Sequence, residues 1–133
     1  IIYENRFLNN WENNINSLMK NFGEKIKNYK SKGYKIAGYG APTKSSLLLS
    51  LAGISKDQIS YIFEDNKLKV GKYLPKLFIP IISSQEFSEN HPDIIIILAW
   101  NFYSEIIQIL EKKISKPVTC IVPLPELKLI EIK

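Results

Sequence analysis

The chain has 133 residues, 45% hydrophobic and 23% charged, a length and composition that predict one folded domain with its own core. Its formal net charge is +5, but the lysines are spread over the predicted helices and loops, so we interpret them as solvated surface and expect no nucleic-acid partner. No run of about 18 apolar residues occurs, so the sequence predicts no membrane partner.

Apolar side chains recur at spacings of three and four along the first 33 residues, which predicts one long amphipathic helix ending near Gly33. They are Phe7, Trp11, Ile15, Leu18, Phe22, Ile26 and Tyr29. A helix of about 25 residues is longer than a strand that it covers, so we expect its N-terminal half to overhang the domain. The chain begins without methionine, and we expect residues 1–33 to link a missing upstream domain to a C-terminal domain of residues 34–133.

Residues 35–51 form the stretch around which the domain is predicted to be organised. They read as a short apolar strand, a turn containing Gly38 and Gly40, and a helix buried by its leucines and ended by Gly53. Glycines allow backbone N–H groups to approach a phosphate closely, and a helix start favours an anion. The pattern is a partial dinucleotide fingerprint, because Thr43 occupies the position of the third glycine. We expect a side chain at Gly40 to obstruct a diphosphate while leaving the strand intact.

Further strands and helices alternate along the rest of the chain. Strands are predicted at residues 59–64, 78–82, 93–98 and 117–122, and the four isoleucines of residues 94–97 are typical of a central parallel strand. Ser83 with Glu86 predicts the start of a short helix, and a second helix follows Asn101 with Phe102, Ile106, Ile109, Leu110 and Ile114 on its inner face. Regular structure is expected to end at residues 123–125.

This alternation predicts an α/β fold, a Rossmann-like doubly wound parallel sheet of about five strands in the order 3-2-1-4-5, preceded by the long helix. In that order the first and fourth strands are neighbours whose connections leave toward opposite faces. A crevice therefore opens between residues 38–44 and residues 99–101, where such sheets bind ligands.

Several polar and aromatic side chains near this crevice have two interpretations. Lys44 either pairs with a phosphate or is a solvated lysine, and Asp65 either binds a ribose or forms an Asx turn. Trp100 offers an apolar plate to a ring, while Asn101 either bonds a ligand or caps its helix, roles that are compatible. His91 has no second imidazole or cysteine beside it in the sequence, so we expect no metal. No general base is identified.

The chain has one cysteine, Cys120, which excludes an internal disulfide framework and a cysteine-rich zinc site. Its apolar neighbours predict a buried strand, and we interpret the residue as an inert reduced thiol. A cytoplasmic location fits this cysteine usage.

A series of motifs resembles the C-terminal domain of sugar-nucleotide C-methyltransferases. The motifs are residues 38–44, Leu47-Leu48, Gly53-Ile54, Asp65-Asn66, Lys69, Gly71-Lys72-Tyr73, Pro75, Ile79-Pro80-Ile81, Pro92-Asp93, Leu98-Ala99-Trp100-Asn101, Glu105-Ile106, Val122-Pro123 and Pro125. Two positions depart from the pattern, since Ser45 and Lys76 stand where we expect glycine.

The resemblance implies an enzyme that uses S-adenosylmethionine to methylate a carbon of a nucleotide-linked deoxysugar. It implies that this domain helps to hold the nucleotide sugar and itself binds no cofactor, while a zinc-binding domain and an upstream methyl-donor-binding domain of the same protein complete the enzyme. The candidate substrate-binding residues are Gly38, Tyr39, Gly40, Ala41, Pro42, Thr43, Lys44, Asp65, Ala99, Trp100 and Asn101.

Two other functions remain open from the sequence. A dinucleotide-dependent oxidoreductase domain is disfavoured by Thr43 and by the lack of an evident catalytic Tyr-Lys or His pair. A non-catalytic interaction module is supported by the long helix and the scattered basic charge alone.

Overall fold

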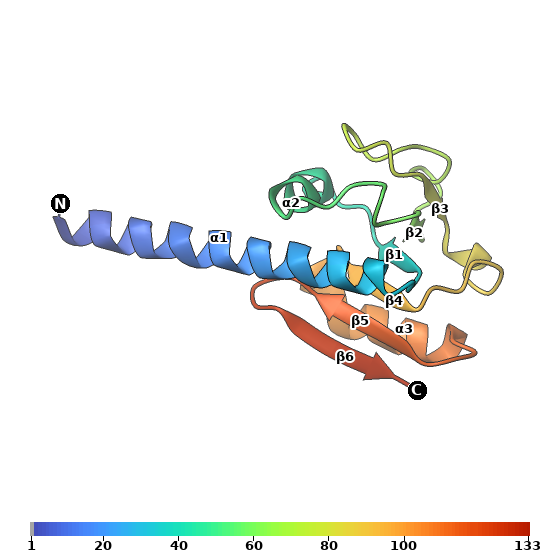
Figure 1. The fold of residues 1–133 in the computed structure, drawn as a ribbon. Coiled ribbons are helices and arrows are strands. Elements are labelled where there is room, and N and C mark those ends of the chain that lie inside the picture. The colour runs from blue at the N-terminus through green and yellow to red at the C-terminus, as the bar shows by residue number, and fades with distance from the viewer. Residues whose placement is uncertain (1) are drawn as a thin grey trace.

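The computed structural model describes residues 2–133, with the side chains of residues 14–133. Its elements in chain order are α1 (Ile2–Ser31), β1 (Ile36–Tyr39), α2 (Ser45–Leu51), β2 (Ile62–Glu64), β3 (Ile81–Ser83), η1 (Ser84–Glu86), β4 (Ile94–Ile97), η2 (Trp100–Phe102), α3 (Tyr103–Lys113), β5 (Val118–Val122) and β6 (Lys128–Ile132) (Figure 1). The predicted α/β fold is confirmed.

The strands form one six-stranded sheet in the order β3-β2-β1-β4-β5-β6. The first five strands are mutually parallel in the predicted order, and β6 adds to the edge antiparallel to β5. The expectation that regular structure ends at residues 123–125 is therefore wrong. Ile132 is buried beside Val118, because the edge of β5 still offers apolar surface and unpaired backbone groups to the returning chain.

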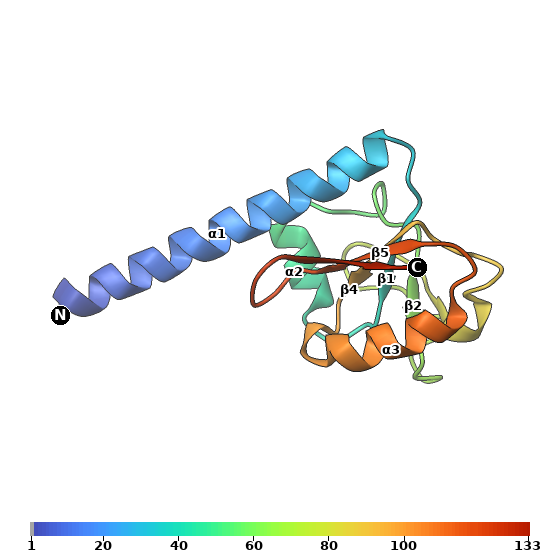
Figure 2. The same cartoon turned by 90° about the horizontal axis from the view of Figure 1, so that it is seen from below.

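Alternating side chains of β1 and β4 build a core on each face of the sheet. Ile36, Ile94 and Ile96 lie in the cluster that includes α1 and α2 residues, whereas Ala37 and Ile95 lie in the cluster that includes α3 residues. Figure 2 shows α1 and α3 on opposite sides of the sheet. The connections that follow β1 and β4 thus leave toward opposite faces, as a switch point between these two strands requires.

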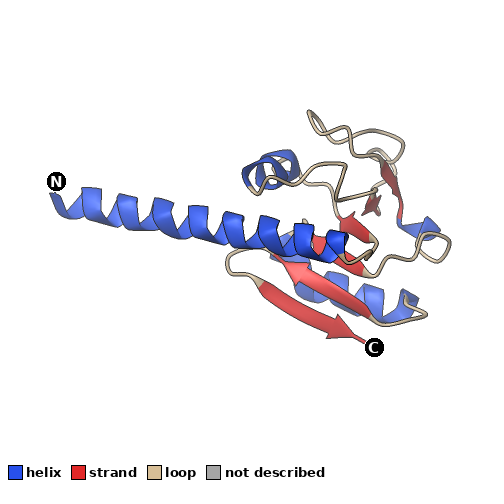
Figure 3. Cartoon of the chain, viewed as in Figure 1, coloured by secondary structure: helices blue, strands red, loops and turns tan. Residues whose placement is uncertain are grey.

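Helix α1 contributes its buried side chains, among those that the structure describes, from its C-terminal half. Phe22 and Ile26 are fully buried, and a Cβ on Gly23 would lie 1.9 Å from the Ala52 oxygen, so the absence of a side chain lets α1 and the end of α2 approach closely. Figure 3 shows the N-terminal half of α1 extending beyond the sheet, as predicted. The predicted docking contacts of Phe7 and Trp11 lie outside the described side chains.

Helix α2 buries one stripe, formed by Ser45, Leu48, Leu49 and Ala52. The predicted burial of Leu47 and Leu51 is wrong, because these residues point away from that stripe and are 60% and 59% exposed. The helix ends as predicted at Gly53, whose φ of +72° and whose N–H bond to the Ser50 oxygen at 3.1 Å form a left-handed cap.

Helix α3 likewise buries fewer residues than predicted. Ile106 and Leu110 are buried, but Phe102 precedes the helix and is 62% exposed, and Ile109 faces partly outward. Asn101 is also not the predicted cap, because it lies inside η2 and α3 begins one residue after Phe102.

Cys120 and His91, to which the sequence assigned structural roles, lie in environments that fit such roles. The Cys120 thiol is buried, and burial raises its pKa to about 12, so it stays a thiol at neutral pH. The His91 Nδ1 donates to the Pro92 oxygen at 2.9 Å, and its Nε2 accepts from the Ser115 N–H at 3.2 Å. Across residues 2–133, no helix combines the length and apolarity needed to cross a bilayer.

Candidate functional site

Gly38, inside β1, and Gly40, in the turn that follows it, are required by packing between neighbouring strands. A Cβ on Gly38 would lie 2.9 Å from Leu98 Cδ1 and 3.1 Å from Ile62 Cγ1. A Cβ on Gly40, which has φ of +87°, would lie 2.9 Å from the Ala99 Cβ. The expectation that a side chain at Gly40 leaves the strand intact is therefore wrong, because the space beside Gly40 is filled by the protein itself.

The buried carboxylate of Glu64 forms hydrogen bonds with the turn between β1 and α2. Glu64, at the end of β2, accepts from the Ala41 N–H at 3.3 Å and from the Asp65 N–H at 2.9 Å. Lys69 Nζ lies 3.8 Å from the same carboxylate and donates to the Ala41 oxygen at 2.9 Å. Glu64 and Lys69 thus fasten the β2–β3 loop to the glycine turn. Neither role was predicted, because the only signal in the sequence is an acid at the end of an apolar strand.

Asp65 accepts hydrogen bonds from the side chains of Tyr39 and Ser84. The Tyr39 hydroxyl donates to Asp65 Oδ1 at 2.9 Å, and the Ser84 hydroxyl donates to the same oxygen. Burial, followed by the bond to Asp65, raises the pKa of Tyr39 far above its usual value, so Tyr39 remains a neutral donor. The Tyr39 ring is buried, so both side chains are occupied by partners within the protein.

The carboxyl ends of β1 and β4 open into a pocket of about 340 Å³. It is lined by Pro42, Thr43, Lys44, Leu98, Ala99, Trp100, Asn101 and Phe102. The structure therefore brings together six of the candidate residues and leaves Gly38, Tyr39, Gly40, Ala41 and Asp65 outside the lining. The crevice expected between the two loops is present at the switch point.

The lining combines one charged group with aromatic rings and short polar groups. Lys44 is its only charged residue, and no carboxylate lies in the lining to repel an anion. Trp100 and the exposed Phe102 supply ring surface, while Thr43 and Asn101 supply exposed polar side chains. Such a set suits a ligand that carries both a negative charge and a ring. Phe102 was not predicted as a site residue, because its spacing assigned it to the helix face.

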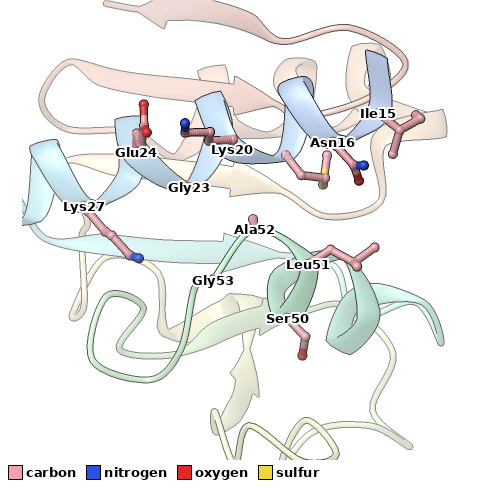
Figure 4. A pocket seen from close by; sticks show the side chains of 11 residues that line it. Ile15, Asn16, Lys20, Gly23, Glu24, Lys27, Ser50, Leu51, Ala52 and Gly53 are labelled. Carbon is pink, nitrogen blue, oxygen red and sulfur yellow. The ribbon is translucent and has the colours of Figure 1, made fainter. Parts of the chain in front are cut away.

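A second hollow of about 370 Å³ lies between α1 and α2. Figure 4 shows Ile15 and Leu51 from the two helices at the same end of it, with Lys20, Glu24 and Lys27 along α1. None of the candidate substrate-binding residues lines this groove. No group of three or more metal-ligating side chains occurs among the described residues.

Comparisons with known proteins agree on one family. The sequence profile of C-methyltransferase C-terminal domains matches residues 2–125. The chain is also 37% identical over 107 residues to the C-methyltransferase NovU of Streptomyces niveus, a match that covers 80% of this chain and 26% of NovU. The chain thus spans about a quarter of the length of the curated relative that it matches.

Proposed function

Because the chain belongs to the family of C-methyltransferase C-terminal domains, we propose that it holds a nucleotide-linked sugar for methylation at carbon. The methyl group comes from S-adenosylmethionine bound by an upstream domain of the same protein. Residues 1–33 connect that domain to the sheet of residues 34–133. The sugar is a deoxysugar and the protein acts in the cytoplasm, where a single reduced thiol such as Cys120 is stable.

The observation that carries this proposal is that Lys44 and Trp100 line the same pocket. A lysine ammonium attracts a diphosphate as a point charge, and an indole ring covers the face of a base or sugar. The pocket lies at the switch point, where open α/β sheets bind ligands. A volume of about 340 Å³ is within the usual size of a small-molecule site.

The geometry of the glycine turn supports the exclusion of a dinucleotide or methyl donor from this domain. Such a cofactor would need free backbone donors and open space at the turn. Here the Ala41 N–H donates to Glu64, and the space that a side chain on Gly40 would occupy is filled by Ala99. An anionic group is therefore better placed beside Thr43 and Lys44 than against the glycines.

Titration calorimetry tests the proposal with three ligands: a nucleotide sugar, S-adenosylmethionine and NAD. We expect the 133-residue chain to bind the nucleotide sugar and neither of the other two. We also expect no transfer of labelled methyl from S-adenosylmethionine by this chain alone, because the methyl-donor domain is supplied elsewhere. Binding of NAD without nucleotide sugar would refute the proposal in favour of an oxidoreductase domain.

A further inference from the structure

An apolar patch lies beside the pocket, and apart from Trp100 its residues do not line the pocket of the proposed ligand. It surrounds a hollow of about 170 Å³ that is lined by Lys44, by the core residues Met19 and Leu48, and by five further apolar residues, Ile15, Leu47, Leu51, Trp100 and Leu124. We call these five apolar residues the leucine patch. Leu47 and Leu51 are one helical turn apart on α2 and are 60% and 59% exposed. Scattered exposed leucines are ordinary, but a contiguous apolar surface marks an interaction site.

The leucine patch adjoins both the long helix and the pocket. Ile15 belongs to α1, and Figure 1 shows α1 running outward from this part of the domain toward its N-terminus. Trp100 and Lys44 line both the patch hollow and the pocket. A structure that covers the patch would therefore lie next to the chain entering through α1 and at the mouth of the ligand pocket.

The length of the relative indicates what covers this surface. The chain corresponds to 26% of NovU and matches a family of C-terminal domains, so the remainder of such a protein lies mainly before this segment. We propose that the leucine patch is the docking surface for the upstream, methyl-donor-binding part of the longer protein. The occupant presents apolar side chains to Leu47 and Leu51, and its position beside Trp100 brings the methyl donor to the pocket. The inference rests on the two-part arrangement of the proposed function, not on the identity of the sugar.

Alkylation of an introduced thiol tests this docking. Leu51→Cys places a thiol in the patch, and Leu68→Cys is the matched control, since Leu68 is 79% exposed and lies in the β2–β3 loop. Both variants are alkylated with iodoacetamide in the 133-residue chain and in the longer protein, and the rates are read by peptide mass spectrometry. Cys120 is buried and serves as the unreactive reference.

In the longer protein we expect the thiol at position 51 to react at least about tenfold more slowly than in the 133-residue chain, with no change at position 68. Equal rates at position 51 in the two proteins would overturn the proposal. A rate in the 133-residue chain that falls as its concentration rises would also overturn it, because a second copy would then cover the patch. Leu47→Cys repeats the test if Leu51→Cys does not fold. No nucleotide sugar is present, so this result is independent of the ligand titration.

Discussion

Gly40 and Ala99 lie side by side in the loops that follow β1 and β4, and a Cβ on Gly40 would lie 2.9 Å from the Cβ of Ala99. Real Cβ atoms do not approach other heavy atoms so closely, so one loop must move if Gly40 gains a side chain. The contact fixes the separation of the two loops that line the pocket. A glycine that looked like a phosphate-binding feature is thus a spacer between two strands.

We predict that Gly40→Ala lowers the free energy of unfolding by about 2 to 4 kcal/mol, from the strain of a positive φ and from overpacking against Ala99. Gly71→Ala is the matched control, because Gly71 has the same φ of +87° and nothing within 4 Å of its Cβ position. It should cost only about 1 to 2 kcal/mol, the strain alone. Urea unfolding of both variants measures the difference.

The double variant Gly40→Ala/Ala99→Gly isolates the contribution of the contact between these two residues. Removing the Ala99 Cβ opens the space, so the two substitutions should show a favourable coupling of about 1 kcal/mol or more in a double-mutant cycle. Additive effects would mean that the cost at Gly40 comes from its backbone conformation and not from Ala99.

Lys76 has φ of +67° in the β2–β3 loop, a conformation that glycine adopts without strain. The resemblance to the family predicted glycine at this position, and the backbone explains why. We predict that Lys76→Gly raises the unfolding free energy by up to about 1 kcal/mol, since relief of strain exceeds the added freedom of the unfolded chain. Lys72→Gly, in the same loop at negative φ, should instead lower it. Thermal melts of the two variants decide the matter.

Asp93 joins the starts of β1 and β4. Its Oδ2 accepts from the Lys35 N–H at 2.8 Å, and its Oδ1 accepts from Lys116 Nζ at 3.0 Å. The Lys35 N–H, followed by Lys116, lowers the pKa of Asp93 in the folded protein. The ionised carboxylate therefore stabilises the fold above its unfolded pKa of about 4, and this contribution is lost as pH falls through the lower folded value.

Asp93→Ala should accordingly cost about 1 kcal/mol at pH 7, a modest figure because the carboxylate is partly exposed. The difference between this variant and the parent should shrink as pH is lowered below about 4. Lys116→Ala keeps the backbone bond and should retain most of the pH dependence. Urea unfolding between pH 2 and pH 7 follows all three proteins. A difference that is independent of pH would assign the effect of Asp93 to packing.

The sequence predicted the features that depend on local pattern. Four consecutive isoleucines identified β4, the alternation of strands and helices gave the order of the first five strands, and that order located the pocket between residues 38–44 and 99–101. Strand β6 was missed because Leu129, Ile130 and Ile132 form a short edge strand, whose formation depends on the exposed edge of β5. Long-range pairing of that kind leaves little local signal.

Side-chain direction was harder to predict than position. Glu64 reads as a strand residue, yet its carboxylate turns back to the Ala41 N–H. Leu47 and Leu51 were predicted to be core leucines, but a helix that packs on one face of a sheet buries one stripe only, and these two residues lie off it. Such choices are decided by neighbours distant in the sequence, so no periodicity reveals them.

Lys44 is the residue whose role in ligand binding can be tested with least effect on the fold. It is exposed, and its side chain makes no capping hydrogen bond at the start of α2, so truncation should leave the helix intact. The backbone oxygen of Lys44 accepts a hydrogen bond from the Leu48 N–H of α2 at 3.1 Å. Alanine retains that oxygen.

We predict that Lys44→Ala weakens nucleotide-sugar binding by about tenfold, because one charge-assisted contact to a phosphate contributes about 1.4 kcal/mol. Lys44→Arg should restore most of the affinity, since a charge within reach of the phosphate is what matters. Lys112→Ala, which removes an exposed charge from α3, controls for the change in net charge and should bind like the parent. Calorimetry gives the affinities, and melting temperatures check that each variant is folded. Equal losses for Lys44→Ala and Lys112→Ala would mean that the ligand senses only the overall positive charge, and the pocket would then lose its one specific anchor for a phosphate.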